Sequence, residues 1–199
     1  MDFEAILNQP FRWPKPGDKL FQVSPHWDGN AYVADHPHSR MVMMMNGYKR
    51  GADLMVERAT SYPPDRDTLV FPIIFNYRQY LELYLKYLIS YYGLTLGVEA
   101  IWDSHDLARL WARFEEILEG SGAADDDGAT AAVVQIIAEF ATVDPRSFSY
   151  RYPVDTKGQA IELAHEHLDL VALADVMKGV DGFFSGCDGY LDALQSAGP

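Results

Sequence analysis

Charged side chains recur along one segment of the chain whose other residues are mostly apolar. Arg78, Glu82 and Lys86 are four residues apart, so a helix would place them on neighbouring turns of one side. Leu81 and Leu85 belong to an apolar stripe at helical spacing, and Arg78 and Glu82 fall near its edge. Two interpretations stay open. The charges either form simple contacts along the helix, with Lys86 turned toward solvent, or they line a cleft that binds an anion or a partner side chain.

A second candidate site, Ser104-His105-Asp106, follows the helix predicted at 68–92 after a connection of about a dozen residues. In the structural interpretation, Asp103 or Ser104 caps the next helix, and Asp106 suits the positive end of that helix. In the functional interpretation, His105 points from the helix end into the same cleft as Arg78. An imidazole there could serve as acid, base or hydrogen-bond donor.

A third candidate is the aromatic segment Tyr150-Arg151-Tyr152, which is followed by Pro153. Aromatic rings beside a guanidinium group can stack a nucleic-acid base or hold a phosphate. Alternatively, Arg151 is structural and hydrogen-bonds backbone carbonyl groups. Taken together, the candidates for catalysis are Arg78, Glu82, His105 and Arg151, which we expect to form one polar cluster. The candidates for ligand binding are Arg78, Lys86, Asp106, Tyr150, Arg151 and Tyr152.

The sequence lacks the spacing of a metal site or a cofactor motif. His165 and His167 are two residues apart, which places their rings on different sides of a helix. No glycine-rich phosphate loop or nucleophile elbow is present. We therefore expect neither a metal nor a cofactor. Cys187 is the single cysteine, so a disulfide framework is excluded and a reducing cytoplasm is expected.

The 199-residue chain is strongly acidic, with a formal net charge of −13. The charge is uneven: residues 1–104 carry 10 basic and 12 acidic side chains, whereas residues 105–199 carry 6 and 17. Such a chain repels a phosphate backbone at long range, which argues against a broad nucleic-acid surface. A small basic pocket remains compatible with the near-neutral first half. No apolar run approaches the roughly 18 residues of a membrane span.

Helical spacing of apolar residues dominates the chain after residue 38 and predicts an all-α protein of about five helices. The expected helices cover about 39–61, 68–92, 104–118, 129–141 and 163–194. Residues 1–38 are rich in proline and aromatic residues, and they predict an extended N-terminal arm. The expected division is therefore an arm at 1–38 and a helical domain at 39–199.

Four glycines, Gly179, Gly182, Gly186 and Gly189, recur at spacings of three and four in the last predicted helix. Glycine lets another backbone approach closely, and it also weakens a helix. The pattern therefore indicates tight helix packing or a break near residues 179–182.

Three segments resemble HEPN-domain proteins: LELYLKYLI at 81–89, HDLARLW at 105–111 and YRYP at 150–153. The resemblance covers about residues 40–195. It implies a compact up-and-down helical bundle that often pairs into a homodimer. Many members of that family are metal-independent endoribonucleases of toxin–antitoxin, abortive-infection and other defence systems, whereas others are binding domains without catalysis.

The catalytic members of that family carry an arginine followed five to seven positions later by a histidine, and this chain has no such pair. Arg151 is followed in that window by Thr156, Lys157 and Gly158. Two hypotheses follow. The chain is a non-catalytic interaction or ligand-binding domain in a bacterial stress or defence context. Alternatively, it is an endoribonuclease with a divergent site, whose targets would be RNA at a local pocket.

Overall fold

The computed structural model describes residue 4 and residues 12–33, 36–123, 128–145 and 147–197. The chain divides into two units, residues 1–33 and residues 34–199. The described part of the second unit forms five α-helices: α2 (Pro37–Ser61), α3 (Arg66–Tyr92), α4 (Leu107–Ser121), α5 (Ala129–Val143) and α6 (Leu170–Ala197). The described residues contain no strand beyond one isolated bridge between Val154 and Ala160. The predicted all-α helical bundle is confirmed.

In the first unit, the described residues 12–33 contain one short 3-10 helix, η1 (Trp27–Gly29), and are otherwise turns and irregular chain. Asn30 closes the turn around it, because its side chain bonds both the backbone N–H and the carbonyl of Ser24 at 2.7 and 2.9 Å. Residues 1–3, 5–11 and 34–35 of the predicted arm lie outside the described residues. Helix α2 begins at Pro37, two residues before the predicted start, because proline suits the first turn of a helix.

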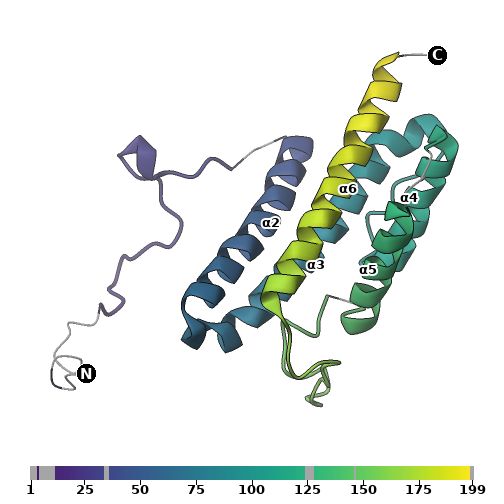
Figure 1. Ribbon diagram of the computed structural model, residues 1–199. Helices are drawn as coiled ribbons and strands as arrows, with labels where there is room; N and C mark the ends of the chain where they lie inside the picture. The colour runs from purple at the N-terminus through teal and green to yellow at the C-terminus, as the bar shows by residue number, and fades with distance from the viewer. Residues whose placement is uncertain (1–3, 5–11, 34–35, 124–127, 146, 198–199) are drawn as a thin grey trace. The chain divides into compact units, whose positions relative to one another are not determined.

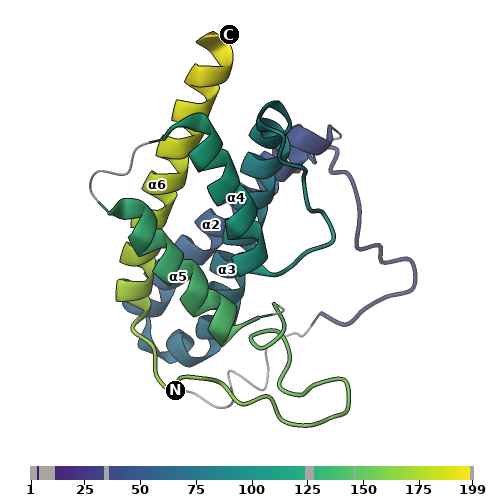
Figure 2. The same ribbon diagram turned by 90° about the vertical axis from the view of Figure 1, so that its right-hand side faces the viewer.

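Helix α3 is the central element of the second unit. It lies between α2 and α4 and also contacts α6 (Figures 1 and 2). Neighbours on several sides bury most of its length, including the charged row Arg78, Glu82 and Lys86. The expectation that Lys86 turns toward solvent is therefore wrong, since only 8% of it is exposed. A helix that is covered by neighbours on most sides has no solvent-exposed face on which a charged side chain could lie.

Helix α6 differs most from the sequence-based expectation. It begins at Leu170 rather than near residue 163, because the Asp169 carboxylate accepts hydrogen bonds from the first free backbone N–H groups, at 2.9 and 3.0 Å. It then continues to Ala197 without the break considered near residues 179–182. In both views its C-terminal end extends past the other helices (Figures 1 and 2).

Two tyrosines of α3 hold α6 in place through aspartates on one side of α6. The Tyr80 hydroxyl donates to Asp181 at 2.5 Å, and the Tyr92 hydroxyl donates to Asp188 at 2.6 Å. Burial, reinforced by the neighbouring carboxylates, raises the pKa of both phenols, so they remain hydrogen-bond donors at neutral pH. This side of α6 is thereby committed to the bundle.

The long connection between α5 and α6 lies at one end of the bundle, opposite the end from which α6 projects (Figures 1 and 2). It contains the predicted ligand-binding segment Tyr150-Arg151-Tyr152. Among the described helices, none is long and apolar enough to cross a lipid bilayer.

Candidate functional site

Arg78 joins three parts of the bundle from a completely buried position, with 0% of its side chain exposed. Its Nη1 donates to Glu82 Oε2 at 3.1 Å on the same helix. Its Nη2 donates to the carbonyl of His105 at 2.7 Å, and its Nε donates to the carbonyl of Asp144 at 2.8 Å. Each guanidinium nitrogen therefore has an acceptor, and the side chain connects α3 to the segments before α4 and after α5.

Glu82 is the carboxylate at the centre of this cluster, and it is 1% exposed. Its Oε1 accepts from Lys86 Nζ at 2.9 Å and lies 2.8 Å from His105 Nδ1. Burial acts to raise the pKa of Glu82, but the hydrogen bonds and charges of Lys86 and His105 outweigh it. The net pKa lies below its ordinary value, so the group is a buried anion at neutral pH.

Lys86 extends the cluster toward the chain that connects α3 and α4. Besides Glu82, its Nζ donates to the carbonyl of Trp102 at 3.2 Å. Arg78 and Lys86 thus each donate to backbone carbonyls outside α3, and Glu82 accepts from both of them. Contacts along the helix, one of the two alternatives that the sequence left open, therefore occur together with contacts to backbone carbonyls on other parts of the bundle.

His105 is the most accessible member of the cluster, with 65% of its side chain exposed. Its backbone carbonyl faces Arg78 and its ring lies against Glu82. The prediction that Asp103 or Ser104 caps the next helix is wrong. Asp106 is the cap, because its Oδ1 accepts from the backbone N–H groups of residues 108 and 109 at 2.9 and 3.2 Å.

Asp144 is a member of the cluster that the sequence analysis did not single out. It is fully buried, and its Oδ1 accepts from the backbone N–H groups of Phe148 and Ser149 at 2.7 and 2.9 Å. Its Oδ2 lies 3.7 Å from Arg78 Nε. An aspartate just after a helix and just before a proline is a local signal for such a turn, but nothing in the spacing links it to Arg78.

Arg151, by contrast, lies outside this cluster. Its Nε donates to the carbonyl of Ser147, and none of the described contacts joins it to Arg78, Glu82 or His105. Its guanidinium carbon lies 5.6 Å from the ring centre of Phe75 and 5.5 Å from that of Tyr152. The expected four-residue cluster therefore forms from three of its predicted members, and Asp144 is where Arg151 was expected.

A pocket of about 440 Å³ adjoins Arg151. Its lining includes Phe71, Tyr150, Tyr152 and Leu163. Tyr150 is nine-tenths buried, and burial together with the charge of Asp144 raises the pKa of its phenol. The two ligand-binding tyrosines predicted from sequence thus lie at one pocket with Arg151, whereas Arg78, Lys86 and Asp106 are engaged elsewhere.

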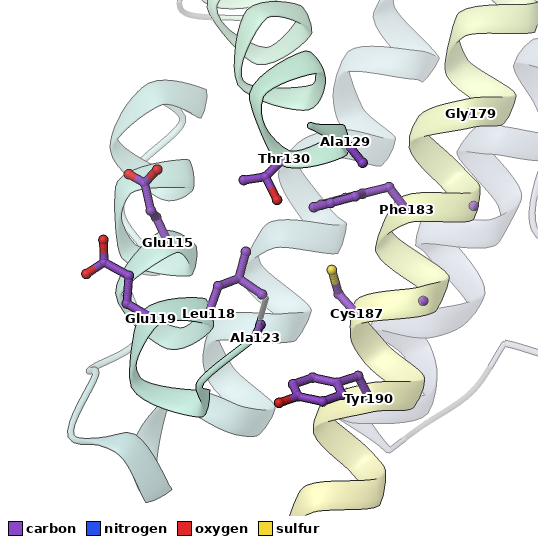
Figure 3. A pocket seen from close by; sticks show the side chains of 12 residues that line it. Glu115, Leu118, Glu119, Ala123, Ala129, Thr130, Gly179, Phe183, Cys187 and Tyr190 are labelled. Carbon is purple, nitrogen blue, oxygen red and sulfur yellow. The ribbon is translucent and has the colours of Figure 1, made fainter. Parts of the chain in front are cut away.

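A larger hollow of about 650 Å³ lies between α4, α5 and α6 and was not predicted as a site. Figure 3 shows Glu115, Leu118 and Glu119 along α4. Phe183, Cys187 and Tyr190 lie opposite them on α6. The lining includes Gly179, Gly182, Gly186, Cys187 and Tyr190 of α6. Burial raises the pKa of the Cys187 thiol to about 11, so it is not an activated nucleophile.

No group of three or more histidine, cysteine, aspartate or glutamate side chains within the described ranges is arranged to hold a metal ion. The chain matches no family model, no curated protein and no solved structure. The resemblance to HEPN-domain proteins therefore stays a prediction from three short segments.

Proposed function

We propose that this chain is a non-catalytic, HEPN-like binding domain that acts in the cytoplasm of a bacterium, in a stress or defence context. The observation that carries the proposal is the burial of Arg78 and Glu82. A catalytic arginine has to reach a substrate, but Arg78 is fully enclosed and each of its nitrogens has a protein acceptor. The buried charges of α3 therefore serve the fold.

The pocket beside Arg151 is the binding site in this proposal. Arg151 is exposed, and its two Nη atoms have no hydrogen-bond partner among the described residues. A guanidinium group with free outer nitrogens binds phosphate or carboxylate in a bidentate manner. The neighbouring Tyr152 ring offers a face for stacking. The ligand class that fits is a small planar molecule with an anionic group, such as a nucleoside monophosphate.

Calorimetric titration with the four ribonucleoside 5′-monophosphates, and with inorganic phosphate, tests this proposal. We expect at least one nucleotide to bind and Arg151→Ala to weaken it about tenfold or more, as loss of a charged hydrogen bond requires. Arg113→Ala is the matched control, because Arg113 is a partly exposed arginine of α4 that pairs with Glu116. Absence of binding by all five probes would contradict the assignment.

One observation favours the alternative, a metal-independent endoribonuclease. His105 is exposed and its Nδ1 lies 2.8 Å from a buried carboxylate, an arrangement that orients an imidazole for proton transfer at its other nitrogen. Incubation with single-stranded RNA in the presence of a chelator decides between the two. Cleavage that disappears in His105→Ala would establish the nuclease and refute a non-catalytic domain.

The proposal includes a homodimer. Met43 and Leu54 are each 46% exposed and lie eleven residues apart on α2, which places them on one face of that helix. Burial of this face against a second copy would remove apolar surface from water. Light scattering at micromolar concentration should give twice the chain mass of 22.4 kDa. A monomeric mass would remove the dimer from the proposal.

A further inference from the structure

The hollow between α4, α5 and α6 is a groove with bare backbone along its α6 wall. Gly179, Gly182 and Gly186 line it at spacings of three and four, which places them on one side of α6. This side points away from the aspartates that bind the α3 tyrosines. The glycine side of α6 therefore takes no part in the hydrogen bonds that hold α6 to α3.

Glycine is a poor helix former, so its recurrence in one helix requires an explanation. Neither explanation that the sequence offered is realised among the described residues. The helix does not break, and a Cβ added to any of the three glycines would meet nothing within 4 Å. Gly93 shows what an internal reason looks like, because a Cβ there would lie 2.5 Å from the Val98 carbonyl oxygen.

We propose that this groove docks a helix of a partner protein that presents small residues to α6 and lysine or arginine at its edge. From Gly179 to Tyr190 the α6 wall extends about 16 Å, which is the length of three helical turns. Bare backbone lets such a helix approach closely. Leu118 and Phe183 supply apolar surface beneath it (Figure 3).

The charge of the groove selects the partner. Glu115 and Glu119 are the charged residues of the lining, both are exposed, and neither has an ion-pair partner among the described residues. Their neighbour Glu116, in contrast, is paired with Arg113 at 3.0 Å. A second copy of this chain would bring the same carboxylates face to face, whereas a basic helix would pair with them.

Cys187 provides a direct test, because it lines the groove and is the single cysteine of the chain. The probe is a synthetic helical peptide of about 18 residues with an alanine stripe and flanking lysines, long enough to hold helical structure. Its control is the same peptide with glutamate at every lysine position. We expect the lysine peptide at saturation to slow alkylation of Cys187 about tenfold, and the glutamate peptide to leave the rate unchanged.

Substitution separates the groove from the rest of α6. Gly182→Leu fills the groove and should abolish protection of Cys187 by the lysine peptide. Gly189→Leu is the matched control, because it makes the same change on the same helix at a position that does not line the groove. Protection should persist there, and circular dichroism melts verify that both variants fold.

Reversal of the groove charge completes the experiment. In the double variant Glu115→Lys and Glu119→Lys, the preference for the lysine peptide should disappear. Failure of the lysine peptide to protect Cys187 in the unaltered chain would overturn the proposal. So would equal protection by both peptides. A dimer that Gly182→Leu converts to monomer would also overturn it, because the occupant would then be a second copy.

Discussion

Two arginines of this chain, Arg78 and Arg151, have opposite surroundings. Arg78 is fully buried and each of its nitrogens donates to a protein acceptor, two of which are backbone carbonyls on other parts of the bundle. Arg151 is exposed, and only its Nε has a hydrogen-bond partner among the described residues. The comparison shows how a structural arginine can be told from a candidate ligand-binding one. The test is how many of its N–H donors are free, because a ligand needs free donors.

The same contrast holds for the carboxylates. Glu82 is buried on α3 and its Oε1 lies 2.8 Å from His105 Nδ1, in the segment before α4. Asp144 is buried after α5 and accepts hydrogen bonds from the backbone N–H groups of Phe148 and Ser149, so each carboxylate fixes one connecting segment. Glu115 and Glu119 are exposed and unpaired within the described residues, so they remain available to a partner. The buried carboxylates that hold the fold are therefore different residues from the exposed carboxylates of the proposed docking groove, and each set can be substituted without the other.

Removal of Arg78 should have the largest effect. Arg78→Ala leaves Glu82 and the carbonyls of His105 and Asp144 without their donor, and we expect a loss of about 3–5 kcal/mol in the free energy of unfolding. Urea denaturation measures it. Arg113→Ala, at a partly exposed pair on α4, should change stability by about 0.5 kcal/mol or less. Equal losses would contradict a structural role for the buried cluster.

Truncation of the apolar core should cost slightly less. Leu85 is fully buried on α3 and Trp111 is 5% exposed on α4, and these two helices pack together. Leu85→Ala and Trp111→Ala should each lower stability by about 2–5 kcal/mol, from lost burial and the cavity left behind. A loss below about 1 kcal/mol in either urea melt would show that the contact between α3 and α4 is weak.

The pH dependence of stability should identify Glu82 as a charged member of the cluster. Because the folded state lowers its pKa below the ordinary value of 4.5, its contribution is complete above that pH and declines as the pH falls through the folded-state pKa. Glu82→Gln should therefore cost about 1–3 kcal/mol at neutral pH and progressively less below pH 4.5. If the stability difference between the unaltered chain and Glu82→Gln did not change with pH, Glu82 would be protonated and neutral in the folded state.

Much of the fold could be predicted because helical periodicity is a local property. The bounds of α2 and α3 were within two residues of those predicted, since Pro37 and Gly93 punctuate them. The start of α6 was missed because its cap, Asp169, looks like any other acidic residue of an acidic stretch. The break expected in α6 does not occur, and the sequence pattern could not show that Tyr80 and Tyr92 of α3 hydrogen-bond to aspartates of α6.

The site was predicted less well, because it depends on contacts between distant segments. Arg78 and Glu82 were found because a charge beside an apolar stripe is a local signal, and His105 was found because it lies at a predicted helix start. Asp144 was missed, since its link to Arg78 spans 66 residues of chain. The groove of α4 and α6 was missed for a related reason. Spacing shows that three glycines share one side of α6, but only the packed bundle shows that no described residue covers them.

Of the two arginines compared, Arg151 should contribute far less to stability than Arg78. Arg151→Ala removes one hydrogen bond to the Ser147 carbonyl and the contact with the rings of Phe75 and Tyr152. Because the guanidinium is exposed, water replaces most of what is lost, and we expect a change of about 1 kcal/mol or less in the urea melt. The nucleotide titration should nevertheless lose its signal in this variant. If Arg151→Ala instead destabilises the chain as much as Arg78→Ala, Arg151 closes the bundle, and the pocket beside it is a consequence of folding that binds nothing.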